Sequence, residues 1–251
     1  MFAAFAKMMC IFSIRKQYEH KSDFVSGTAD IWCVRFESSY SGSGLRNKKC
    51  ASKRYDVKMT TNCMDNSCDG QANIDLYLKG TTQHFQHFSS AELTMDLDET
   101  YKPSVNVVQL YGEQSALIFA DFNFDGSEDV AIRNGNYGAY GGPTYDVYVF
   151  HRSKNKFVLS EELSALTHEN LGMFEVDPKQ KRILTFNKSG CCYHIRSEYI
   201  VIPKHGLSLV REFIEDATVQ AGKVKVTERM LNLGRWIEKV HYYAVDEYYK
   251  N

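Results

Sequence analysis

The chain has 251 residues and 43% hydrophobic content, a composition that supports a packed core and excludes disorder as the default. Its formal net charge is -1, and its 30 lysines and arginines are spread along the chain, so no basic region gathers polyanions such as nucleic acid. Aromatic residues make up 13% of the chain against only 4 prolines, which favours strands over helices. We therefore expect a mainly β protein that does not bind nucleic acid.

The N-terminal part of the chain contains little that predicts a core. Residues 1–20 include an apolar stretch with Lys7 in its middle, and they resemble a degenerate or truncated signal or anchor segment. Cys10 in this stretch is a lipidation candidate, although small residues do not precede it. Residues 21–54 are expected to form a loosely structured arm. No run reaches the ~18 apolar residues that a membrane span needs. We therefore expect the protein to be soluble or, at most, tethered to a membrane by its N-terminus.

From Tyr55 onward, short alternating segments are separated by turn residues at intervals of about 8 to 14 residues, a spacing typical of sandwiches, barrels and propellers. We expect one domain over residues 55–251, with one short helix at Ser160–Thr167 that Ser160 caps. Gly234 predicts a hairpin between the last two strands. The predicted strands are Tyr55–Thr60, Ala72–Leu78, Ala91–Leu97, Val105–Tyr111, Ser115–Ala120, Glu128–Arg133, Asp146–His151, Met173–Val176, Arg182–Asn187, Tyr193–Ile202, Leu207–Phe213, Lys223–Leu231 and Arg235–Asp246.

Seven cysteines are compatible with an oxidising compartment. Cys63 and Cys68 enclose a short polar loop, and another pair, Cys33 and Cys50, brackets a stretch rich in serine, glycine and lysine. The neighbouring cysteines of the segment CCYH predict a vicinal disulfide or the pairing of one of them with a distant cysteine, because no second pair with metal-ligand spacing lies nearby. We expect a periplasmic or otherwise extracytoplasmic protein.

Oxygen-bearing side chains occur at every second position of one loop, hereafter the acidic loop, and they are Asp121, Asn123, Asp125, Ser127 and Asp129. The order D-x-N-x-D-G matches the start of an EF-hand loop, in which glycine permits the sharp turn, but Ile132 stands where that motif has a bidentate glutamate. Apolar residues on both sides predict strands. We expect a structural Ca²⁺ held by these side chains and by the Ser127 carbonyl. A metal-free turn held by side-chain to backbone hydrogen bonds is the alternative.

Residues Asn134–Tyr145, hereafter the Gly/Tyr loop, combine glycines with three tyrosines. Glycine allows unusual backbone torsions, and tyrosine offers a large rigid contact surface with a hydrogen-bonding tip. The candidate partner-binding residues are Asn136, Tyr137, Tyr140 and Tyr145. Tyr145 is the weakest of these because it begins the next strand. The alternative is a turn whose tyrosines fold back onto the sheet.

The remaining histidines and acidic residues give weaker evidence for a metal or catalytic site. His84 and His87 are separated by an odd number of positions, which puts them on opposite faces of a strand, so we expect solvated or packing histidines. The acidic residues at Glu161–Glu162 and Glu212–Asp216 are expected on solvated faces. Neither a G-x-S-x-G elbow nor an H-E-x-x-H motif occurs, and nothing selects a pair of carboxylates for acid and base catalysis. We therefore expect a protein that is not an enzyme.

The acidic loop and its flanking strands resemble the calcium loops of integrin-type β-propellers. The following residues NGNYGAYGGPTYDVYVF, and the later segments KFVLSEELSAL, GMFEVDPKQKRI and KSGCCYH, are similar to a group of bacterial periplasmic proteins. These are calcium-binding, propeller-like immunity proteins that inhibit lysozyme-like peptidoglycan hydrolases delivered by an antibacterial type IV secretion system. The resemblance covers roughly Val105 to Thr218.

The resemblance implies a β-propeller-like domain that binds and inhibits a peptidoglycan hydrolase, a lysozyme-like effector, and is itself no enzyme. The chain departs from the pattern in lacking a lipobox, and fold does not fix function. A second hypothesis is an envelope adhesion or scaffold module that binds glycan or protein without inhibition. A third is a hydrolase whose acidic residues the sequence does not single out.

Overall fold

The structure is a computed structural model that describes residues 34–38, 51–99 and 101–250, the first of these ranges by its backbone alone. The predictions for residues 1–20, for Cys10 and for the pair of cysteines at positions 33 and 50 lie outside the described side chains. None of the described helices is long and apolar enough to cross a membrane.

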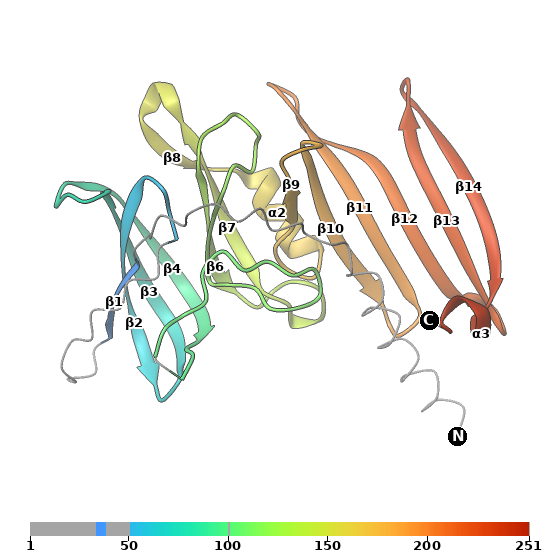
Figure 1. The fold of residues 1–251 in the computed structure, drawn as a ribbon, viewed down its shortest axis with the longest axis horizontal. Helices are drawn as coiled ribbons and strands as arrows, with labels where there is room; N and C mark the ends of the chain where they lie inside the picture. The colour runs from blue at the N-terminus through green and yellow to red at the C-terminus, as the bar shows by residue number, and fades with distance from the viewer. Residues whose placement is uncertain (1–33, 39–50, 100, 251) are drawn as a thin grey trace, which may run out of the picture. The chain divides into compact units, whose positions relative to one another are not determined.

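The described strands form three sheets (Figure 1), so the mainly β class is confirmed. The first sheet has the order β1-β2-β3-β4, in which β1 is parallel to β2, and the second has the order β5-β6-β7-β8. The third has the order β14-β13-β12-β11-β10-β9. Among the described residues these sheets do not close into a barrel or a propeller, so the propeller-like arrangement stays a prediction.

The elements have the following bounds. The first sheet contains β1 (Val34–Ser38), β2 (Tyr55–Met64), β3 (Ser67–Leu78) and β4 (His84–Asp96). The second contains β5 (Leu117–Ala120), β6 (Asp129–Gly135), β7 (Thr144–His151) and β8 (Lys156–Leu159). The third contains β9 (Glu175–Asp177), β10 (Arg182–Ser189), β11 (Tyr193–Ile202), β12 (Gly206–Gln220), β13 (Lys223–Asn232) and β14 (Arg235–Ala244). The helices in the described residues are η1 (Ala139–Gly141), η2 (Arg152–Lys154), α2 (Glu161–Glu169) and α3 (Val245–Tyr248).

Most of the predicted strands form, with two kinds of difference. The segment Val105–Tyr111 makes only an isolated bridge, Val108 to Gln114, because its backbone turns through positive φ at Asn106 and Tyr111. Strands β1 and β8, and helix α3, were not predicted. The predicted helix is α2, and the Ser160 side chain accepts a hydrogen bond from the Leu163 amide at its start.

The chain divides into two compact units, and one domain over residues 55–251 stays a prediction. The N-terminal unit spans Asp30–Thr185 with Val201–Leu207, and the C-terminal unit spans Phe186–Ile200 with Ser208–Asn251. Each disulfide lies within one unit: Cys63–Cys68 joins directly paired residues of β2 and β3, and Cys191–Cys192 is the vicinal pair before β11. Two disulfides are typical of proteins folded in an oxidising compartment.

Aromatic side chains join the first two sheets within the N-terminal unit. The buried Tyr55 ring lies 5.4 Å from Phe157, which lies 5.5 Å from Phe150, and Phe88 lies 4.7 Å from Tyr148. Such tilted and edge-on contacts add to the hydrophobic gain of burial. This common core fixes the β6–β7 hairpin, which carries both candidate loops.

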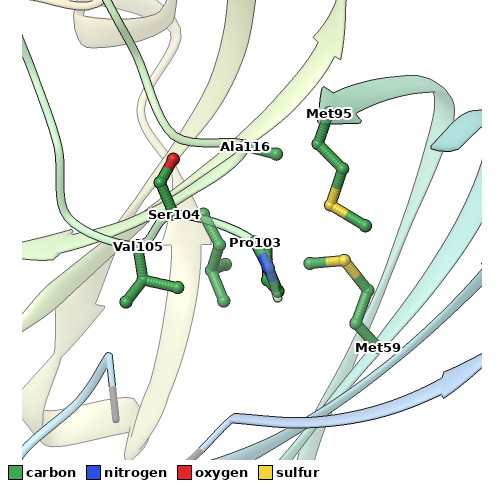
Figure 2. Close-up of a pocket in the computed structure, with 7 residues that line it drawn as sticks. Met59, Met95, Pro103, Ser104, Val105 and Ala116 are labelled. Atoms are coloured by element: carbon green, nitrogen blue, oxygen red, sulfur yellow. The ribbon is translucent and has the colours of Figure 1, made fainter. Parts of the chain in front are cut away.

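A small apolar cavity lies in the same unit. Met59 and Met95 extend from their strands toward Pro103, and Val105 lines the neighbouring wall (Figure 2). Its volume of ≈ 10 Å³ is about that of one water probe, and its lining is apolar, so it offers no ligand site.

The C-terminal unit buries charges that were expected on a solvated face. Glu212 is 8% exposed and accepts a hydrogen bond of 2.6 Å from Arg229. Glu215 is 3% exposed, accepts a hydrogen bond of 2.7 Å from the Tyr248 hydroxyl and lies 3.7 Å from Arg196. The sequence prediction was wrong here because the partners come from other strands and from α3.

Candidate functional site

The acidic loop connects β5 to β6, whose first residue is Asp129. Most side chains of β5 and β6 are buried in the core of the N-terminal unit. Within the loop, Phe122 is 1% exposed and meets Phe174 edge-on at 5.5 Å. Gly126 adopts a φ of +83°, a conformation that glycine permits without strain. The loop is thus a tight turn with one side chain anchored in the core.

Three of the predicted ligand side chains turn back onto the backbone of their own loop. Asp121 accepts hydrogen bonds from the amides of Asp125 at 3.0 Å and Gly126 at 2.8 Å. Asn123 accepts a second bond from the Asp125 amide at 3.0 Å, and Asp125 accepts one from the Ser127 amide at 2.7 Å. The oxygens of these three residues therefore converge on one short backbone segment.

Asp129 is fully buried, at 0% exposure. One carboxylate oxygen accepts the amide of Phe122 at 2.9 Å, and the other accepts the amide of Phe150 at 2.8 Å. The pKa of Asp129 is raised to about 7, mainly by burial. The two hydrogen bonds lower it, and the neighbouring carboxylates of Asp125 and Asp121 contribute smaller increases. Asp129 ties the acidic loop to β7, and its charge lacks compensation within this network.

Arg152 supplies a positive charge at the rim of the acidic loop. Its guanidinium donates to the Ser127 hydroxyl at 2.9 Å and to the Asp125 carbonyl at 2.6 Å, and it lies 3.8 Å from the Asp125 carboxylate. The side chain is 63% exposed, so solvent screens this pair. Arg152 has no signal in the sequence, because it follows β7 and stands at no motif spacing from the acidic loop.

The donor set fits calcium in its chemistry. Calcium accepts six to eight oxygens from carboxylates, amides, carbonyls and water, and a carboxylate oxygen that accepts one amide keeps a second lone pair. In the described part of the chain, no three His, Cys, Asp or Glu side chains are grouped so that they alone could hold a metal ion. The ion would therefore also need the Asn123 amide oxygen and the Ser127 carbonyl.

The Gly/Tyr loop connects β6 to β7 through the short helix η1. Tyr137 is 62% exposed and Tyr140 is 63% exposed, so both rings reach the surface. Tyr145 is placed differently: it is 0% exposed, and its hydroxyl donates to the Ser115 carbonyl at 2.9 Å. Tyr145 therefore belongs to the core and offers no surface to a partner, which corrects its place among the candidate contact residues.

One side of the Gly/Tyr loop is held by β4. Asn136 accepts a hydrogen bond from Arg133, and its amide lies 3.5 Å from the Thr94 hydroxyl. Tyr137 makes a side-chain hydrogen bond with Glu92 that raises the pKa of the Tyr137 hydroxyl. Thr94 and Glu92 have no signal in the sequence, because only the packing of β4 beside β6 brings their strand to the loop.

The other side of the Gly/Tyr loop is held by backbone hydrogen bonds. The Gly138 amide donates to the Gly142 carbonyl at 3.0 Å, and the Ala139 amide donates to the Asn170 carbonyl, just after α2, at 3.2 Å. A Cβ on Gly138 would come within 3.1 Å of the Thr167 carbonyl. The loop thus packs backbone against backbone, and the tyrosines project from a braced segment.

The two loops lie at opposite ends of one hairpin. Strand β6 runs from Asp129 to Gly135, and β7 returns from Thr144 to Phe150, whose amide binds Asp129. At ~3.3 Å per strand residue, six residues separate the two ends by about 20 Å. The acidic loop therefore holds the base of the hairpin, and the Gly/Tyr loop forms its tip.

The two histidines of β4 share one face, which corrects the expectation of opposite faces. His84 lies 3.1 Å and His87 lies 2.8 Å from the same oxygen of Asp75. The reason is a β-bulge, because the pairing register shifts between Leu76 and Tyr77 and skips one residue of β4. Burial raises the pKa of Asp75, but the hydrogen bonds from the two histidines outweigh it and lower the pKa overall.

Comparisons with known proteins agree with this fold. No protein-family model and no curated protein matches the chain. A solved structure of similar fold is that of a Xanthomonas type IV secretion system related protein, with a TM-score of 0.53. The two chains are 24% identical, over 73% of this chain and 88% of that chain. At this identity the likeness shows a common fold and nothing more.

Proposed function

We propose that this chain is a calcium-binding protein of the bacterial envelope that binds and inhibits a lysozyme-like peptidoglycan hydrolase. The observation that carries the proposal is the pair Tyr137 and Tyr140, each more than 60% exposed on a loop braced from two sides. Large rigid side chains on a fixed loop lose little conformational entropy on binding, which is why tyrosine is frequent at energetic centres of interfaces.

The chemistry of the target explains why tyrosine suits this role. Glycan-cleaving enzymes place two carboxyl groups on either side of the scissile bond, in a cleft shaped for sugar rings. A tyrosine ring fills such a subsite, and its hydroxyl donates to a carboxylate there. Tyr137 or Tyr140 entering the cleft would displace substrate and engage the group that must transfer a proton. The chain itself performs no reaction in this scheme.

Calcium has a structural part in the proposal. Asp121, Asn123, Asp125 and Asp129 would hold the ion together with the Ser127 carbonyl. The ion supplies the positive charge that the buried Asp129 carboxylate lacks. Since the acidic loop lies at the base of the hairpin and the tyrosines at its tip, the ion stabilises the unit and does not touch the partner.

A periplasmic location and a propeller-like arrangement belong to the same proposal. The two disulfides suit the periplasm. Each of the two sheets of the N-terminal unit has four strands, as a propeller blade has, and β5 to β8 follow one another in the up-and-down order of a blade. The resemblance of the sequence to periplasmic immunity proteins points the same way.

The test is a cell-wall clearing assay with a lysozyme-like hydrolase, with affinity measured in parallel. The native chain should preserve turbidity, and the double variant Tyr137→Ala, Tyr140→Ala should lose affinity by about tenfold or more. Tyr101→Ala is the matched control, because Tyr101 is 65% exposed and has a φ of 57°, as Tyr140 does, but lies outside the loop.

Three results would contradict the proposal. If every hydrolase tried, including those encoded beside the gene, cleared cell walls equally well in the presence of the chain, the chain would not be an inhibitor. Binding that is tight but leaves clearing unchanged would favour the adhesion or scaffold function instead. Equal loss of affinity in the Tyr101 control would remove the Gly/Tyr loop as the contact.

A further inference from the structure

The tip of the β13–β14 hairpin carries an unusual turn residue. The strands pair without interruption from Lys223–Ala244 to Asn232–Arg235, leaving Leu233 and Gly234 as the two-residue turn (Figure 1). Both turn residues have positive φ, 49° and 76°. Such turns favour Asn-Gly or Asp-Gly, because a leucine side chain disfavours the left-handed conformation.

Leu233 is also 98% exposed. The residue therefore combines an unfavourable backbone conformation with a side chain that is almost fully exposed, and packing against the described residues offsets neither cost. An asparagine at this position would form the turn better. A leucine here would gain from an apolar environment, which the described residues do not provide.

Apolar side chains continue on both faces of the hairpin next to this turn. Met230 pairs with Ile237, and the two are 53% and 43% exposed. The adjacent pair is Leu231 with Trp236, and Trp236 is 39% exposed. Because successive pairs of a ladder point to opposite faces, the tip exposes apolar groups on both sides and at its end.

The charge of the tip is positive. The eight residues from Met230 to Ile237 contain Arg235 and no acidic residue. The Arg229 guanidinium lies 4.9 Å from the Trp236 ring centre, and it pairs with Glu212 at 2.6 Å and Glu238 at 3.7 Å, farther from the turn. The carboxylates are thus set back, and Arg235 remains at the tip.

We propose that this hairpin tip inserts into the surface of a lipid bilayer with anionic headgroups. A bilayer surrounds an inserted tip on all sides, which accounts for apolar groups on both faces, whereas a protein pocket usually receives one face. Leu233 enters the acyl region, Trp236 lies at the interface that its amphipathic ring favours, and Arg235 binds lipid phosphates. The inference stands independently of the hydrolase partner.

Vesicle sedimentation with the full chain tests the proposal. The chain should sediment with vesicles of phosphatidylethanolamine and phosphatidylglycerol, and less with vesicles of phosphatidylcholine alone. Leu233→Asn should reduce the partition to the anionic vesicles about tenfold, because one buried leucine is lost. Arg235→Gln should reduce it about fivefold and leave phosphatidylcholine binding unchanged.

Val219→Asn is the matched control. Val219 is 51% exposed near the end of β12, beside the turn that leads into β13 and therefore at the opposite end of that strand. This variant should keep full vesicle binding. The Leu233→Asn variant should melt at the same temperature as the native chain or higher, because asparagine tolerates the turn conformation, so loss of binding cannot come from unfolding.

Tryptophan fluorescence gives a second readout. With Trp32→Phe in the background, Trp236 is the remaining tryptophan, and its emission should shift to the blue on addition of anionic vesicles. The proposal is overturned if the native chain sediments with neither kind of vesicle. The tip would then be expected to insert into an apolar pocket of a partner protein. The proposal is also overturned if Leu233→Asn and Val219→Asn bind equally.

Discussion

The two ends of the β6–β7 hairpin use similar turn-forming residues for opposite purposes. At the base, the oxygens of Asp121 and Asp129 are directed at amides of their own backbone and of β7. At the tip, the backbone binds itself and α2, and the side chains of Tyr137 and Tyr140 remain at the surface. The two loops thus differ in which atoms face the solvent. The structural loop uses its side-chain oxygens to bind backbone amides, whereas the contact loop pairs its backbone and exposes its tyrosine side chains.

Removing the buried carboxylate should have the largest effect. Asp129→Ala leaves two buried amides, of Phe122 and Phe150, without an acceptor, and each costs about 1–3 kcal/mol. We expect a loss of about 3 kcal/mol or more in the free energy of unfolding by urea. Asp125→Ala is the control in calcium-free buffer, because the Asp125 side chain is 37% exposed, and it should cost less than about 1 kcal/mol.

If Asp129→Ala and Asp125→Ala lost similar amounts of unfolding free energy, the prediction would be wrong. Asp129 would then be no more important to the base of the hairpin than the exposed Asp125. The measurement needs a chelator, because bound calcium would make both residues matter.

Calcium removal should have the next largest effect. At a free calcium concentration 100 times the dissociation constant, binding adds about 2.7 kcal/mol to the stability. A chelator should therefore lower the melting temperature of the native chain and leave that of Asp125→Ala unchanged. Because the acidic loop lies about 20 Å from the tip, affinity for the hydrolase well below the melting temperature should change little.

An unchanged melt on chelation would remove the proposed ion and leave the hydrogen-bonded turn as the whole explanation of the acidic loop. If the affinity for the hydrolase fell as calcium was removed, the ion would also affect the conformation of the tip.

A substitution at the tip should cost less stability but more affinity. Gly135 has a φ of +147°, and a Cβ there would lie 2.3 Å from the Tyr137 ring. Gly135→Ala must therefore displace the ring, and we expect a loss of about 1–2 kcal/mol in stability. Binding to the hydrolase should weaken by about as much as in Tyr137→Ala. Gly141→Ala is the control, because no heavy atom lies near its Cβ position, although its φ of +69° is also positive.

If Gly135→Ala bound the hydrolase as tightly as the native chain, the pose of Tyr137 would be irrelevant, and only the exposed area of the loop would count. If Gly141→Ala weakened binding equally, backbone strain and not displacement of the ring would be the cause.

The sequence predicted what depends on local spacing. The alternation of apolar residues located most strands, Ser160 marked the start of α2, and the D-x-N-x-D-G order located a turn that concentrates oxygens. The cysteines five positions apart are bonded, as their spacing suggested. These features involve residues that lie close in the chain, so their geometry follows from strand and turn periodicities.

What the sequence could not predict depends on partners from distant strands. Tyr145 is buried because the loop packs on α2, and Glu92 holds Tyr137 because β4 packs beside β6. His84 and His87 share a face because of one bulge, which a period of two cannot anticipate. The binding of calcium, the hydrolase partner and the propeller-like arrangement remain predictions.

The smallest expected effect concerns a half-buried carboxylate, Glu175, which contrasts with the fully buried Asp129. Glu175 follows Phe174, which packs on the acidic loop, and burial raises the pKa of Glu175 against one hydrogen bond from the Leu110 amide. The folded chain therefore holds this proton more tightly than the unfolded chain. The cost of the Glu175 charge to stability is absent below the unfolded pKa, grows as the pH rises between the unfolded and the folded pKa, and is constant above the folded pKa.

Glu175→Gln should accordingly stabilise the chain at pH 7 by less than about 1 kcal/mol, and the gain should vanish as the pH falls below the ordinary glutamate value of 4.5. Urea unfolding of both chains at several pH values measures this. A gain that is the same at all pH values would show that the charge of Glu175 is not the cause. Asp129→Asn should behave oppositely at neutral pH, because an amide replaces one of two essential acceptors with a donor.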